Sequence, residues 1–134
     1  MEFRDLALNY FCYLNKEFNF NQPQYENDVF TESLTYMKKT VAIRISYSLR
    51  EAGVEVEIIR LIKNKLPPYP ILKSDPNQKY YMNLDTILQD KSPNLVFSKP
   101  SINEYLKNPF VLKEVLSKYA QALKEYCPDF LSLE

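Results

Sequence analysis

The sequence contains no histidine and no tryptophan, and Gly53 is the only glycine among its 134 residues. Histidine is the most frequent general acid/base and metal ligand near neutral pH. Its absence excludes Ser-His-Asp and Cys-His catalysis and every zinc site with histidine ligands. A single glycine cannot form a phosphate-binding P-loop or a dinucleotide fingerprint. The chemistry left to the chain is that of carboxylate, tyrosine, lysine and cysteine side chains.

Net charge and long apolar runs are also lacking. Seventeen basic and seventeen acidic residues cancel, whereas proteins that bind nucleic acid usually carry a basic surplus. No apolar run approaches the roughly 20 residues that a membrane span needs. We therefore expect neither a nucleic acid nor a membrane as a partner.

Cysteine is scarce as well. Cys12 and Cys127 lie far apart and each falls in a predicted helix. Two cysteines are too few for a disulfide framework or a four-cysteine zinc site. Residues 1–5 mix charges before the chain turns amphipathic, which is unlike a secretory signal. The sequence thus predicts free thiols, no cofactor and a cytoplasmic protein.

The residues that are present predict helices at both ends of one globular domain. Hydrophobic residues make up 46% of the chain and aromatic residues 14%, a composition typical of a folded domain. Apolar side chains recur at three- and four-residue steps in 3–18 and 109–126, the pattern of amphipathic helices. A capping box starts at Ser101, and Asn108 precedes Pro109 as a second helix start.

Alternating apolar and polar residues predict strands between these helices. The alternation covers 40–49 and resumes at 54–58. Its parity favours a four-residue loop of 50–53, with Gly53 supplying a positive φ angle. Segment 33–37 fits a helix as well as a strand, and we favour the strand. A short strand is also expected at 80–82, followed by a helical turn that Asn83 caps.

These patterns predict one α+β domain over residues 1–134, an antiparallel meander of three or four strands with N- and C-terminal helices packed on one face. The consecutive pair Ile58-Ile59 breaks the alternation and indicates either a bulge or a sheet covered on both faces. The side chains expected on the buried face are those of Val41, Ile43, Ile45, Tyr47, Val54 and Val56.

Charged residues separate along the predicted sheet. Lys38 and Lys39 precede one strand, and further lysines follow the next strand at the same end. Glu55 and Glu57 lie toward the Gly53 turn. Such a pattern fits solvated turns, and it also fits a protein interface steered by charge. The candidate partner-binding residues are Lys38, Lys39, Arg44, Glu55 and Glu57.

Two other functions remain open. Glu55 and Glu57 point to the same face of a strand, about 7 Å apart, a separation close to that of glycosidase carboxylates. A histidine-free enzyme could use this pair. A small-ligand domain with a pocket of tyrosine and phenylalanine is the other alternative. Because a binder needs no histidine, metal or cofactor loop, we expect a non-catalytic protein.

The order of features resembles small α+β bacterial proteins of the polymorphic-toxin immunity type. It comprises an N-terminal amphipathic helix, a tyrosine-rich meander with the hairpin 40–62, the segment 82–88 (MNLDTIL) and a closing helix that ends in 122–131 (ALKEYCPDFL). The resemblance covers most of the chain in layout and rests on no motif, so it carries over no functional residue. It implies a protein that binds and neutralises a cognate toxin.

Overall fold

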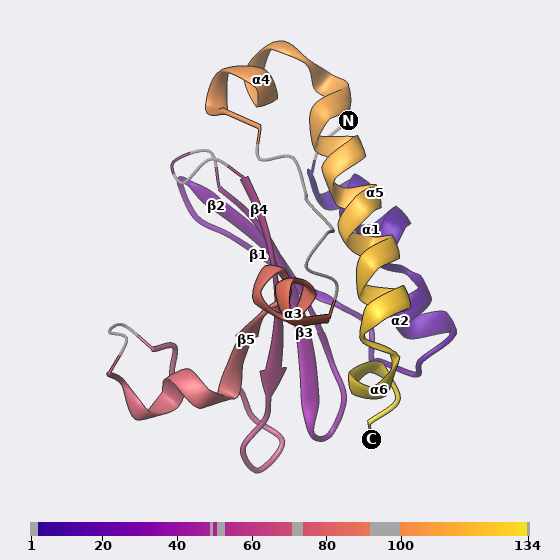
Figure 1. Ribbon diagram of the computed structural model, residues 1–134, viewed down its shortest axis with the longest axis vertical. Helices are drawn as coiled ribbons and strands as arrows, with labels where there is room; N and C mark the ends of the chain where they lie inside the picture. Colours follow the sequence, from indigo (N-terminus) through magenta and orange to yellow (C-terminus); the bar gives the residue numbers. More distant parts are fainter. Residues whose placement is uncertain (1–2, 49, 51–52, 71–73, 92–99, 134) are drawn as a thin grey trace.

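Five strands form an antiparallel meander in the computed structural model, which describes residues 3–48, 50, 53–70, 74–91 and 100–133 (Figure 1). Their order in the sheet follows their order in the chain. The strands are β1 (Gln24–Asn27), β2 (Thr31–Met37), β3 (Val41–Ser48), β4 (Gly53–Arg60) and β5 (Tyr81–Asn83). The predicted fold class is confirmed, although the sheet has five strands instead of three or four, and one strand was not predicted from the sequence. That strand is β1, which has no buried residue and therefore no apolar alternation to reveal it.

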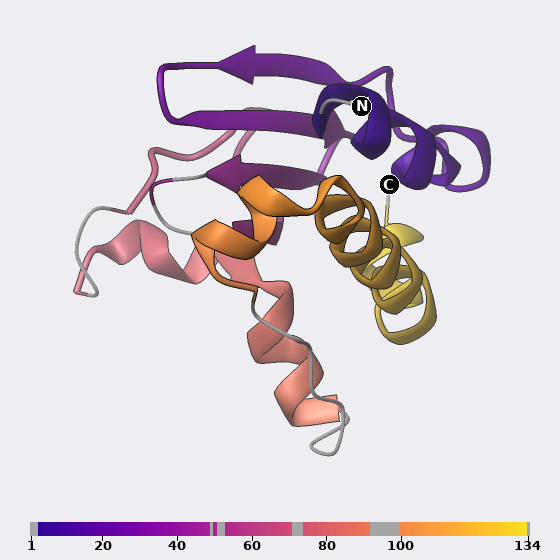
Figure 2. The same cartoon turned by 90° about the horizontal axis from the view of Figure 1, so that it is seen from above.

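Helices cover one face of this sheet. The described helices are α1 (Phe3–Phe11), α2 (Tyr13–Lys16), α3 (Leu84–Lys91), α4 (Ile102–Lys107), α5 (Pro109–Tyr126) and α6 (Pro128–Leu131), and a 3₁₀ turn, η1 (Pro76–Tyr80), precedes β5. The N-terminal α1 packs against α5 on the covered face (Figures 1 and 2). The helix predicted at 3–18 is split, because Cys12 separates α1 from α2.

The expected helix starts are all present. Ser101 and Glu104 form a complete capping box on α4. The side chain of Asn108 accepts a hydrogen bond from the amide of Phe110 at the start of α5. None of the helices in the described ranges combines the length and the apolar character needed to cross a bilayer. Both cysteines are free thiols, with Cys127 buried and Cys12 half-buried.

The main core lies between the sheet and the helices. Ile43, Ile45 and Ile58 are fully buried there, together with Phe11 of α1 and Leu116 of α5. Burial of such side chains contributes about 1.5–3 kcal/mol each. The predicted buried face is confirmed: its members belong to this core or, for Tyr47, pack partly buried against it.

The β3–β4 connection begins and ends one residue earlier than the expected loop. Ser48 pairs with Gly53 and Tyr47 with Val54, so the connection is 49–52 rather than 50–53. The expected loop would have paired Val54 with Leu49 instead of Tyr47. Tyr47 and Leu49 point to the same face of the strand, so the alternation permits either pairing. Gly53 has the expected positive φ, at 149°, although it begins β4. Of the predicted loop, residues 51 and 52 lie outside the described residues, as does residue 49.

The break in alternation at Ile58-Ile59 reflects two buried faces. The β3–β4 register runs through both residues without a bulge. Ile58 belongs to the main core, whereas Ile59 packs on the opposite face with Ala42, Leu61 and Tyr81. The segment 61–70 covers this second cluster, since the hydroxyl of Tyr81 donates to the carbonyl of Pro67. Both sides of the sheet are therefore covered at this end.

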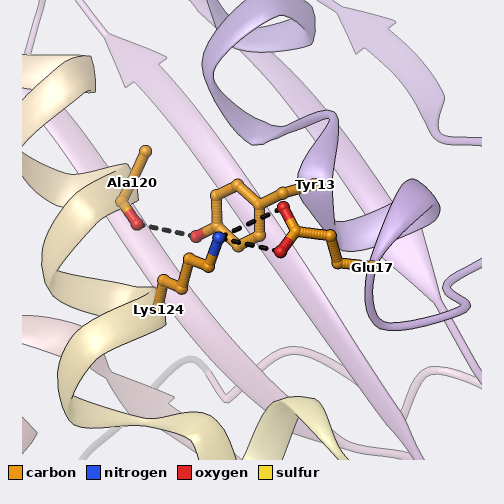
Figure 3. A network of polar contacts seen from close by, with 4 residues as sticks. All are labelled: Tyr13, Glu17, Ala120 and Lys124. Atoms are coloured by element: carbon orange, nitrogen blue, oxygen red, sulfur yellow. Dashed lines mark hydrogen bonds and ion pairs between the residues drawn. The ribbon is translucent and has the colours of Figure 1, made fainter.

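A polar network joins α2 to α5 (Figure 3). The hydroxyl of Tyr13 donates to the carbonyl oxygen of Ala120 at 2.7 Å. Lys124 forms an ion pair with Glu17 at 2.9 Å, and its Nζ atom lies 5.3 Å from the centre of the Tyr13 ring. Burial raises the pKa of Tyr13 far above its ordinary value, so the hydroxyl stays protonated as a donor. The network holds the N-terminal helices against the long C-terminal helix.

The two halves of this network should contribute unequally to stability. We expect Tyr13→Phe to lower the free energy of unfolding by about 1 kcal/mol, because it removes a partly buried hydrogen bond. Lys124→Met should cost only about 0.5 kcal/mol, because exposed ion pairs contribute little. Urea denaturation of both variants measures the difference. A larger loss in Lys124→Met than in Tyr13→Phe would contradict this order.

Candidate partner-binding cleft

The second face of the sheet is polar over most of its length. Paired residues on neighbouring strands point to the same face, so the strand register aligns their side chains in rows. One row contains Glu26, Ser33, Ser46 and Glu55. The next row contains Gln24, Thr35, Arg44, Glu57 and Asn83. These rows end at the cluster around Ile59, so the face is apolar and covered at one end and polar at the other.

The first row, together with Arg44, Glu57 and Asn83 of the second, forms the floor of a cleft of about 720 Å³. β5 pairs with β4 only from Glu57 to Ile59. Beyond this paired stretch, where β4 carries Gly53 and Glu55, the lining of the cleft extends from the sheet to the helices. The walls include Tyr69 from the segment 61–70, Asp85 of α3, Tyr105 of α4 and Tyr119 of α5. The cleft therefore combines residues from most parts of the fold.

Glu57 is the most buried acidic side chain of the cleft, with 7% of its surface exposed. It faces Arg44 on β3 and Asn83 on β5. Burial and the nearby charge of Glu55 raise the pKa of Glu57, while Arg44 and a hydrogen bond from Tyr69 act in the opposite direction. Burial and the carboxylates of Glu57 and Glu55 raise the pKa of Tyr69 to about 12, which keeps its hydroxyl protonated. Tyr69 thus closes over Glu57 as a hydrogen-bond donor.

Asn83 positions two of the carboxylates in the cleft. Its side-chain nitrogen donates to Oε1 of Glu55 at 2.9 Å, and its side-chain oxygen accepts from the amide of Asp85 at 2.8 Å. The second bond is the predicted cap of the helical turn after β5. Asp85 in turn accepts from the hydroxyl of Tyr119 at 2.9 and 3.1 Å. Burial and the charge of Asp85 raise the pKa of Tyr119, so this tyrosine also remains a donor.

The structure brings together three of the five candidate residues. Arg44, Glu55 and Glu57 all line the cleft. Lys38 and Lys39 lie at the other end of the sheet, in the turn between β2 and β3, where they border a hollow together with Asn64. The turn after β4 that carries Lys63 and Lys65 shares this end of the sheet with the β2–β3 turn, as the meander predicts (Figure 1).

Lys38 has a structural role in addition to its charge. Its Nζ atom donates to the carbonyl oxygens of Leu131 at 2.6 Å and Leu133 at 2.8 Å. It also lies 4.7 Å from the centre of the Phe20 ring. Lys38 therefore fastens the chain around α6 to the sheet, whereas Lys39 is exposed.

Most of the cleft lining was not among the sequence candidates, including Glu26, Tyr69, Asp85 and Tyr119. Glu26 lies on the strand that the sequence did not reveal. Tyr119 falls on the apolar stripe of α5 and is 3% exposed, so its periodicity indicates core packing and conceals its hydroxyl. No local pattern marks Tyr69 or Asp85, because both reach the cleft through tertiary packing.

Within the described ranges, no group of three or more histidine, cysteine, aspartate or glutamate side chains is arranged to hold a metal ion. Comparison of the chain with protein-family models, with curated proteins and with solved structures gives no match. The cleft is therefore interpreted from its own geometry and charge.

Proposed function

We propose that this chain is a non-catalytic protein-binding domain that acts as an immunity protein and neutralises a cognate toxin. The observation that carries the proposal is the polar cleft on the second face of the sheet. Its carboxylates are held by Asn83, Tyr69 and Tyr119 before any partner arrives. Preorganised polar groups lower the cost of ordering an interface, and charged groups steer the encounter with a partner.

The lining of the cleft favours a protein over a small apolar molecule. Small-ligand pockets are mostly apolar with a few polar groups. Here serine, glutamate, aspartate, asparagine and arginine side chains line the cleft beside tyrosine and valine, so its polar groups are many and not few. A neutralising protein works by covering its target, which requires shape and charge and no chemistry of its own.

A histidine-free enzyme is the second candidate, and the raised pKa of Glu57 beside Glu55 favours it. Pairs of carboxylates with different environments are typical of acid/base catalysis. Tyr69 donates a hydrogen bond to Glu57, however, and the Glu57 residue is only 7% exposed. Glycoside turnover that disappears in Glu57→Gln would establish the enzyme instead.

The test of the proposal is growth protection. A toxin gene from the immediate neighbourhood of this chain's gene is expressed in a sensitive host with and without the chain. We expect growth only with the chain, a stoichiometric complex on gel filtration, and an affinity that falls as salt is added, because screening weakens charge steering. A chain that remains alone in its host lysate and gives no protection would refute the proposal.

A further inference from the structure

We infer that the segment 61–70 is a strap that detaches from the second face of the sheet while the rest of the domain stays folded, with Tyr69 as its latch. Detachment opens the end of the cleft at which the polar floor meets the apolar cluster around Ile59. This conformational change goes beyond the proposed function and does not depend on which partner the cleft binds.

The backbone of the strap is joined to the sheet mainly at its first residue. The amide of Leu61 donates to the carbonyl oxygen of Thr40 at 2.9 Å and so continues the β3–β4 ladder. Ile62 and Lys65 then bond to each other across a tight turn. Three of the five residues in 66–70 are prolines, which have no amide hydrogen to donate. Among the described residues, none pairs its backbone with that of 66–70, so Leu61 is the hinge of the strap.

Three polar and aromatic contacts between described residues hold the strap against the sheet. The hydroxyl of Tyr81 donates to the carbonyl oxygen of Pro67. The ring of Tyr69 packs edge-on against the ring of Tyr81, with 5.0 Å between the ring centres and 62° between the planes. The hydroxyl of Tyr69 donates to Glu57. Because Tyr69 makes two of these contacts, we assign it as the latch.

The apolar surface under the strap is small. Leu61, Pro67 and Pro70 are buried, whereas the other strap residues are exposed, including Tyr69 with 54% of its surface. Segments with few buried apolar contacts open locally at a lower free energy than the whole domain unfolds. The main core lies on the other face of the sheet, so it stays intact when the strap detaches. The cluster under the strap has four buried members: Ala42, Ile59, Leu61 and Tyr81.

Opening of the strap lengthens the cleft. With the strap closed, Tyr69 lines the cleft and Glu57 has 7% of its surface exposed. Ile59 lies two residues after Glu57 on β4, so its side chain points to the same face about 7 Å further along the strand. When the strap detaches, water reaches Glu57 and the floor extends to Ile59. The closed cleft is therefore short and polar, whereas the open cleft ends in an apolar surface.

Thiol labelling measures the opening. Ile59→Cys introduces a thiol under the strap, and the native Cys127, fully buried in the main core, reports unfolding of the whole domain. The protein is treated with iodoacetamide at neutral pH, and mass spectrometry follows the two positions separately. We expect position 59 to be labelled at least about 10-fold faster than Cys127, with little dependence on low concentrations of urea, because local opening exposes little surface. Ala42→Cys, a second reporter in the same cluster, should give the same result.

Two further substitutions in the Ile59→Cys protein separate the latch from general stability. Tyr69→Phe removes one hydrogen bond of the closed state, so labelling at position 59 should become about 5-fold faster. Ile43→Val is the matched control, because it weakens the main core, which the open state retains. It should accelerate labelling of Cys127 about 5-fold and change labelling at position 59 less than about 2-fold.

Three results would overturn the inference. Equal labelling rates at position 59 and Cys127 would mean that the strap opens only when the whole domain unfolds. Equal acceleration of both positions by Ile43→Val would mean the same. Unchanged labelling at position 59 in Tyr69→Phe would show that Tyr69 is not the latch.

Discussion

Ile45→Asp is expected to abolish cooperative unfolding of this domain. Ile45 has 0% of its surface exposed and lies in the middle of β3, between Leu34 of β2 and Val56 of β4. A carboxylate at this position has no partner in the core. Burying it costs several kcal/mol, a large part of the roughly 5–15 kcal/mol that stabilises a domain. Circular dichroism during heating should show no native transition for the variant.

Ser46→Asp is the matched control, because it introduces the same side chain one residue further along the strand. Ser46 lies on the floor of the cleft, half-buried and opposite Glu55. The added carboxylate meets water and one like charge, so the loss should stay near about 1 kcal/mol. Wild-type stability in Ile45→Asp combined with unfolding of Ser46→Asp would show that the faces of β3 are assigned in reverse.

Arg44→Met is expected to destabilise the fold by about 3 kcal/mol at pH 7, because it leaves the buried carboxylate of Glu57 without its opposite charge. Arg44 pairs with Glu57 across β3 and β4. Methionine keeps much of the length and apolar stem of arginine, so the change isolates the charge. Urea denaturation at pH 7 measures the loss.

The loss in Arg44→Met should depend on pH. In the folded protein the pKa of Glu57 lies above its ordinary value of 4.5, mainly because the group is buried. Ionisation of Glu57 therefore costs stability as the pH rises through its folded pKa, and this cost vanishes below the unfolded value. Removing Arg44 raises the folded-state pKa of Glu57 further. The pH range between its unfolded and folded pKa values, over which stability falls, therefore becomes wider. We expect the deficit of Arg44→Met to shrink as the pH falls from 7 toward 4.5.

The control for this prediction is Arg44→Met/Glu57→Gln. Glutamine has nearly the same shape as glutamate and carries no charge, so the double variant should be more stable at pH 7 than Arg44→Met alone. The difference in the free energy of unfolding between the double variant and Glu57→Gln should not change with pH. A deficit in Arg44→Met that neither acid nor Glu57→Gln relieves would mean that Arg44 stabilises the fold by packing and not by charge.

The elements that sequence reasoning predicted correctly are those with local causes. The strand that contains Ile45 and Ser46 is visible from alternation alone, because successive side chains of a strand face opposite sides. The helix starts at Ser101 and Asn108 depend on hydrogen bonds over two or three residues. The presence of Arg44, Glu55 and Glu57 on one face follows from the same alternation and the pairing of two adjacent strands.

Other features depend on contacts between distant residues. β1 has a strand neighbour but no fully buried residue, so its pairing with β2 is what defines it. Parity alone could not decide which pair closes the β3–β4 hairpin, and the structure closes it with Ser48 and Gly53. The role of Lys38 depends on Leu131 and Leu133, more than 90 residues away.

The sequence by itself determined which side chains share a face, where the helices begin, and that the chain has no histidine or net charge to use. Only the tertiary structure decided that the polar face becomes a cleft. Tyr69, Asp85 and Tyr119 reach it from three separate segments, and packing of the segment 61–70, α3 and α5 around the sheet positions them. Periodicity records the direction of a side chain relative to its own element, whereas a site depends on the distances between elements.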